Sequence, residues 1–109
     1  MGLPSLQRSR HESQPETVKR FVVTVLAEEG EQQWNLDILK RIKSKVWGDC
    51  DYELKRIRVV EQKAEAFLAT IIHELTHAAN DKLTEEEVER IEKTIAPALW
   101  AMGYRRKKT

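Results

Sequence analysis

The N-terminal third of the chain carries apolar residues at helical spacing. Between residues 16 and 31 they recur every three or four positions, at Val18, Phe21, Val22, Val25 and Leu26. The β-branched run at 22–25 favours a strand instead, whereas Gly30 suits the end of a helix. We predict a helix over 16–31. Residues 1–15 contain little that is apolar, and they predict a flexible tail.

The middle of the chain alternates apolar and polar positions. Residues 55–60 alternate strongly enough to predict a strand. Residues 36–47 are ambiguous, because Leu36, Leu39 and Ile42 have helical spacing while residues 41–47 alternate. Since a lone strand is unstable, we predict a second strand at 41–47, with Gly48 and Asp49 as the turn of a small antiparallel sheet.

Two helices are predicted for the rest of the chain. The first covers about 64–80 and ends at Asn80. The second begins with a capping box, in which Thr84 is the N-cap and Glu87 lies three residues on, and it ends at Gly103. Pro97 predicts a kink near Thr94. The apolar stripe of this helix comprises Val88, Ile91, Ile95, Ala98, Leu99 and Met102.

Together these elements predict an α+β fold with an N-terminal helix, a small antiparallel sheet and two C-terminal helices. A length of 109 residues suits one domain, which we place at 16–104, before a basic tail at 105–109. The apolar runs are too short to span a membrane, and the N-terminus lacks the apolar stretch of a secretory signal. Cys50 is the only cysteine, which excludes an internal disulfide. We expect a cytoplasmic monomer.

Charge is segregated along the chain, although the net charge is only +1. Residues 37–60 carry 7 Lys and Arg against 4 Asp and Glu, and residues 96–109 carry 4 against none. Residues 61–95 are acidic, with 4 against 9. This pattern is compatible with a cation site, a nucleic-acid surface or solvated helix faces.

One motif in the predicted helix 64–80 carries recognisable chemistry. Residues 73–77 read His-Glu-Leu-Thr-His, the His-Glu-x-x-His pattern of zinc metallopeptidases. The two imidazoles lie one turn apart on the same side of a helix and can reach one metal ion. Glu74 lies beside the ion and can take a proton from a water molecule. We predict one zinc ion per chain, with His73 and His77 as ligands and Glu74 as general base.

The position of the motif on its helix supports this prediction. His73 and His77 point away from the main apolar stripe of the helix, and their side carries the small or polar residues Ala66, Thr70 and Asn80. Two alternatives stay open: a pair of surface histidines without a function, and a zinc site without catalysis.

A third protein ligand is expected for catalytic zinc, and a carboxylate must supply it, because no histidine follows His77. Glu85 is the first choice, since it opens the helix that folds back on the motif. Glu89 is placed to hold the free N–H of a ligand histidine, and Glu92 is the alternative ligand. Tyr52 and Tyr104 are the phenols that could stabilise an oxyanion.

These residues resemble the gluzincin arrangement of zincin-like metallopeptidases, in which a downstream helix supplies a glutamate ligand. The small size is similar to that of minigluzincins. Residues 34–106 are also similar to small proteins of phages and prokaryotes assigned as metallopeptidases, through WGDCDY at 47–52, IRV at 57–59, IHELTHA at 72–78 and LTEE at 83–86.

The resemblance implies a twisted sheet over the motif helix, with an edge strand that pairs with the extended backbone of a peptide or protein substrate. The predicted strand at 55–60 stands where that strand is expected. The function implied is zinc-dependent hydrolysis of peptide bonds. One alternative is a non-catalytic zinc-binding regulatory domain, associated with nucleic acid through the basic strands and residues 105–108. Another is a metal-free helical interaction protein.

Overall fold

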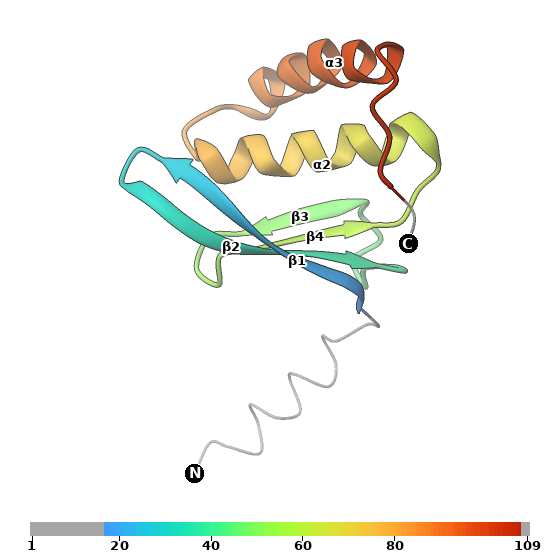
Figure 1. Ribbon diagram of the computed structural model, residues 1–109. Coiled ribbons are helices and arrows are strands. Elements are labelled where there is room, and N and C mark those ends of the chain that lie inside the picture. Colours follow the sequence, from blue (N-terminus) through green and yellow to red (C-terminus); the bar gives the residue numbers. More distant parts are fainter. Residues whose placement is uncertain (1–16, 108–109) are drawn as a thin grey trace.

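The computed structural model of the chain describes residues 17–107. Within this range a four-stranded sheet is followed by two helices (Figure 1). The strands are β1 (Thr17–Ala27), β2 (Gly30–Leu39), β3 (Gly48–Asp51) and β4 (Arg56–Val60), and the helices are α2 (Ala64–Ala79) and α3 (Glu85–Ala101). The α+β class is thereby confirmed. The predicted flexible tail at 1–15 lies outside the described residues.

The sheet is mixed, with the strand order β1-β2-β4-β3. β1 and β2 form an antiparallel hairpin, β2 and β4 are parallel, and β3 is antiparallel to β4. The predicted all-antiparallel sheet is therefore wrong. Because β4 lies between β2 and β3, the connection from β2 to β3 crosses β4. Among the described strands, β1 and β3 are the two edges.

The predicted N-terminal helix at 16–31 is also wrong. This segment forms β1 and the turn into β2, where Gly30 has a φ of 127°. Alternate residues of β1 face the helices, so that Val25 is buried in the core and Val23 packs against it. The intervening Val22 and Leu26 are exposed on the opposite face. Apolar residues on both faces of the strand imitate the spacing of a helix.

The strand predicted at 41–47 is a loop, and its place in the sheet is taken by β3. The predicted turn at Gly48 and Asp49 is therefore wrong, because these residues begin β3, and the turn into β4 lies at residues 52–55. The strand predicted at 55–60 is confirmed as β4, Arg56–Val60. It occupies the interior of the sheet because a parallel partner, β2, covers its other side.

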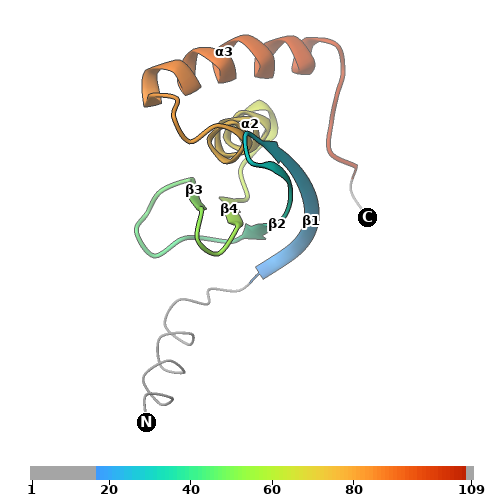
Figure 2. The same cartoon turned by 90° about the vertical axis from the view of Figure 1, so that its left-hand side faces the viewer.

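The elements form three layers, with the sheet below α2 and α3 packed on the far side of α2 (Figures 1 and 2). The main core lies between the sheet and α2, and it includes Trp34, Leu36 and Ile38 of β2, Ile57 and Val59 of β4, and Phe67 and Ala78 of α2. A second small cluster of Leu39, Ile42 and Val60 holds the β2–β3 loop against the other face of the sheet.

Both C-terminal helices are confirmed within one residue of their expected starts. The capping box of Thr84 and Glu87 is present, and α3 continues through Pro97. Of its predicted apolar stripe Val88 is buried, whereas Ile95 and Met102 are exposed, and the other buried residue of the helix, Ala96, lies outside that stripe. The reason is that α3 packs mainly on α2. Neither described helix is long and apolar enough to cross a membrane.

Candidate metal centre

The C-terminal half of α2 directs two imidazoles towards the start of α3. His73 and His77 lie one turn apart, and their ring centroids are 4.9 Å apart. Both side chains are largely shielded, with 16% and 20% of their surface exposed. Since α3 runs back along α2 after a short connection, its first turns lie beside the C-terminal half of α2, which carries the histidines (Figure 1).

Glu85, the first residue of α3, contacts both histidines with one carboxylate. Its Oε2 atom lies 2.8 Å from His73 Nε2, and its Oε1 atom lies 3.0 Å from His77 Nε2. The capping box fixes the start of α3 and thereby the position of Glu85. One ligand atom from each of the three side chains lies within 4.8 Å of the others. The residues predicted as zinc ligands from the sequence are thus brought together.

The second nitrogen of His73 is held by Glu92. The distance from His73 Nδ1 to Glu92 Oε1 is 2.9 Å. Burial lowers the pKa of His73, but the hydrogen bonds with Glu92 and Glu85 outweigh burial and raise the pKa overall. The sequence favoured Glu89 as the carboxylate that holds a ligand histidine, but Glu89 is exposed. Within residues 17–107, the glutamates in contact with the two imidazoles are Glu85 and Glu92.

Glu74 is one of the two buried charged residues of the described chain, with 8% of its surface exposed. It lies on the side of α2 that faces β3, and it lines the same cavity as the histidines and Glu85. Burial raises the pKa of Glu74 to about 7, and the neighbouring His73 opposes this shift. A carboxyl group with a pKa in this range can accept and return a proton near neutral pH.

Gly48 allows β3 to approach α2 closely above Glu74. A Cβ atom at this position would lie 2.9 Å from Thr70 Cγ2 and 3.1 Å from Glu74 Cγ. Gly48, Asp49 and Cys50 together form the β3 wall of the cavity, whose volume is about 330 Å³. Sequence reasoning missed this wall, because it assigned Gly48 and Asp49 to a turn. Burial raises the pKa of the Cys50 thiol to about 12, so this group is uncharged at neutral pH.

Of the two candidate phenols, Tyr52 lies at the site and Tyr104 lies away from it. Tyr52 lines the cavity, and its hydroxyl donates a hydrogen bond to the carbonyl oxygen of His77 at 2.7 Å. Burial raises the pKa of Tyr52, which keeps the phenol protonated. Tyr104 follows the C-terminal end of α3, whereas Glu85 lies at the opposite end of that helix. Tyr104 does not line the cavity.

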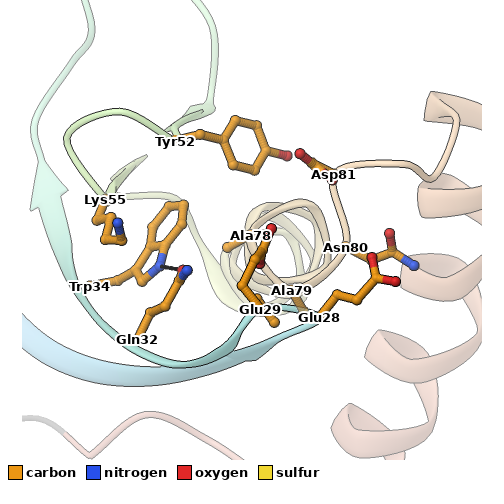
Figure 3. Close-up of a pocket in the computed structure, with 11 residues that line it drawn as sticks. Glu28, Glu29, Gln32, Trp34, Tyr52, Lys55, Ala78, Ala79, Asn80 and Asp81 are labelled. Carbon is orange, nitrogen blue, oxygen red and sulfur yellow. Dashed lines mark hydrogen bonds between the residues drawn. The ribbon is translucent and has the colours of Figure 1, made fainter.

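A second cavity, of about 260 Å³, shares Tyr52 with the first (Figure 3). Trp34 packs edge-on against the Tyr52 ring, at 5.9 Å between centroids. Figure 3 shows Tyr52 reaching across towards Asp81, at the end of α2. The remaining wall comes from the β1–β2 turn, with Glu28 and Glu29. None of the three candidate metal ligands lines this cavity, so it adjoins the metal centre without being part of it.

The donor set fits zinc in chemistry and in spacing. Two imidazole nitrogens and one carboxylate are the ligands of many catalytic zinc sites. With bonds of about 2.0 to 2.1 Å, tetrahedral coordination separates neighbouring ligand atoms by about 3.3 Å, and the contacts of Glu85 with the two imidazoles measure 2.8 and 3.0 Å. Because Glu92 holds His73 at Nδ1, Nε2, which contacts Glu85 in this structure, is the nitrogen that would bind a metal.

Compared with known proteins, the chain matches no protein-family model, no curated protein and no solved structure. The resemblance to zincin-like metallopeptidases therefore stays a prediction from the sequence.

Proposed function

We propose that the protein is a zinc-dependent metallopeptidase of the zincin-like, gluzincin type. The observation that carries this proposal is the convergence of His73, His77 and Glu85 beside the buried carboxylate of Glu74. A structural zinc site uses four protein ligands, whereas a catalytic site uses three and keeps one position open. Three donors on the wall of an open cavity support the catalytic alternative.

When bound by His73, His77 and Glu85, zinc would supply a Lewis acid that acidifies a water molecule and polarises the scissile carbonyl group. Glu74 accepts the proton of the attacking water and returns it to the leaving amine. Glu92 holds the His73 imidazole in one orientation through Nδ1. The Tyr52 phenol, which lines the cavity, is the candidate donor to the developing oxyanion, and to act in this way it would release its hydrogen bond to the His77 carbonyl oxygen.

The edge of the sheet beside this cavity is suited to an extended substrate. Val60 N–H donates a hydrogen bond to Trp47 C=O. Along an antiparallel strand every second residue is hydrogen-bonded to the partner strand, so the backbone groups of Asp49 and Asp51 also point towards β4. The N–H and C=O groups of Gly48 and Cys50 then point outward from the edge. A peptide added there as a further strand would lie alongside Glu74 and the histidines. The strand available to pair with a substrate is therefore β3. From the sequence we expected β4 in this role, but β4 is already paired on both sides.

Cleavage of a peptide library by the purified zinc-loaded protein tests this function. We expect products with the wild type and at least a hundredfold slower cleavage with Glu74→Gln, because the amide cannot accept the proton. Glu86→Gln is the matched control, since Glu86 is an exposed neighbour in the first turn of α3. Equal cleavage by wild type and Glu74→Gln would show that the activity belongs to a contaminant and would refute the proposal.

A further inference from the structure

The β2–β3 loop, residues 40–47, concentrates positive charge on the face of the sheet opposite the helices. It contains Lys40, Arg41, Lys43 and Lys45 and no carboxylate. All four cations are exposed, and none forms an ion pair within residues 17–107. The loop must cross β4 to reach β3, and it therefore spreads these cations over one surface.

A buried side chain and two backbone hydrogen bonds fix the backbone of the loop that carries these cations. Ile42 is buried with Leu39 and Val60 on this face of the sheet. Lys45 N–H donates to Ile42 C=O at 2.8 Å, and Val60 N–H donates to Trp47 C=O at 2.8 Å. Lys45 has a φ of 63°, a left-handed conformation that a lysine adopts only at some cost.

The loop borders a cavity of about 470 Å³ that is lined by both apolar and cationic side chains. The apolar lining consists of Ile42, Val46, Trp47 and Val60, and the four cations complete it. The Trp47 side chain is 61% exposed, which is unusual for so large an apolar group. An exposed indole beside lysines is the combination with which proteins bind unpaired bases and the phosphates between them.

We propose that this loop surface binds single-stranded nucleic acid, with a base stacked on Trp47 and flanking phosphates contacted by the loop cations. A flat base matches the exposed indole and the apolar part of the cavity lining, and an acidic peptide need not offer such a group. Insertion into a membrane requires a broad exposed apolar surface, whereas this loop exposes two large apolar side chains, Val46 and Trp47, among four cations.

Two basic residues outside the loop, Arg58 and Arg105, are already engaged by other contacts. Arg58 on β4 pairs with Asp49, and Arg105 stacks on the Trp100 ring and donates to two carbonyl groups. Three of the four loop cations, Arg41, Lys43 and Lys45, belong to the segment 41–47 that the sequence predicted as a basic strand, and the structure places them in this loop.

Binding of a fluorescein-labelled 15-mer of deoxythymidine to the full chain tests this proposal by anisotropy at several salt concentrations. Contacts with four phosphates predict a slope of about −2.8 for log K against log salt. Replacing Lys40, Lys43 and Lys45 by Gln should reduce this slope to about −0.7. Lys82→Gln, Arg90→Gln and Lys93→Gln together remove the same charge from exposed positions elsewhere, and this control should bind as the wild type does.

The fluorescence of Trp47 provides a second measurement. The other two tryptophans are less accessible to a bound base, because Trp34 is buried and Trp100 is covered by Arg105. Trp47→Ala should weaken binding about tenfold, whereas Trp47→Phe should retain most of the affinity. The oligonucleotide should quench the tryptophan fluorescence of wild type and of Trp100→Phe, and quenching should be lost in Trp47→Phe.

Three results would overturn the proposal. One is an affinity for a 15-base-pair duplex equal to that for the single strand, with no quenching of tryptophan fluorescence by either. This result would indicate only general charge attraction. Another is tighter binding to phosphatidylserine vesicles than to the oligonucleotide, and the third is equal competition by a polyglutamate peptide. The outcome is independent of peptidase activity, because none of the substituted residues belongs to the metal centre.

Discussion

At the scale of single residues, Gly48 and Glu74 depend on each other. The absence of a side chain at Gly48 lets β3 lie close to α2, and this contact helps to bury Glu74. Burial in turn raises the pKa of Glu74. The glycine therefore acts by setting the environment of the proposed general base.

Gly48→Ala should lower the free energy of unfolding by about 1 to 3 kcal/mol, because its Cβ atom would overlap Thr70, Glu74 and the carbonyl oxygen of Arg58. Urea unfolding of the metal-free protein measures this change. Thr70→Ser removes the closest methyl group while keeping a hydroxyl, so the glycine substitution should cost less in that background. An unchanged stability of Gly48→Ala would show that β3 does not pack closely on α2.

Glu92 acts on the metal centre through His73. Replacing a carboxylate that orients a ligand histidine typically weakens metal binding about 10- to 100-fold, and we expect this loss for Glu92→Ala. Competition with a chromogenic chelator measures the zinc affinity. Glu89→Ala, on the exposed side of the same helix, should bind zinc as tightly as the wild type. Equal losses in the two variants would point to a general charge effect.

At the scale of elements, a row of alternating charges crosses the whole sheet. Arg20 of β1 stands opposite Asp37 of β2, Asp37 opposite Arg58 of β4, and Arg58 opposite Asp49 of β3. Asp37 is only 3% exposed, and Arg20 meets both of its oxygens, at 2.7 and 2.8 Å. The row helps to fix the register of the strands, because a shift by one residue would separate the opposite charges.

Arg20→Ala should lower the free energy of unfolding by about 1 to 2 kcal/mol, since it leaves a buried carboxylate with one partner fewer. The effect is moderated because the Arg20 side chain is 54% exposed. In the background of Asp37→Asn the same substitution should cost less, and a double-mutant cycle in urea measures the difference. Additive losses would mean that the two side chains do not interact energetically.

The helices were predictable from sequence because their signals are local. The capping box defines the start of α3, and the spacing of His73 and His77 requires only one regular helix. β1 was not predictable in the same way, because Val18, Val22 and Leu26 are apolar and yet lie on the exposed face. Its strand conformation depends on pairing with β2, which is a tertiary contact.

The same distinction applies to the site. The histidines and Glu74 follow from one helix, whereas the choice between Glu89 and Glu92 depends on how α3 is rotated and how closely it approaches α2. The contribution of Gly48 depends on which strand lies at the edge of the sheet, and the sequence gives no local signal for strand order.

At the scale of the whole molecule, the segregated charges lie on two separate surfaces. The acidic segment 61–95 contains α2 and the first part of α3, which together carry the candidate zinc ligands. The basic loop 40–47 lies on the other face of the sheet, held there by the cluster of Leu39, Ile42 and Val60. β3 connects the two, since it follows the loop directly and forms one wall of the site.

The zinc content of the purified protein, measured by mass spectrometry after dialysis against a zinc buffer, tests the central claim most directly. We predict one zinc ion per chain for the wild type and for Glu89→Ala. His73→Ala, His77→Ala and Glu85→Ala should each lose most of the metal while remaining folded by circular dichroism. Wild type without stoichiometric zinc, or unchanged zinc in the folded His73→Ala and His77→Ala variants, would contradict the assignment of the site.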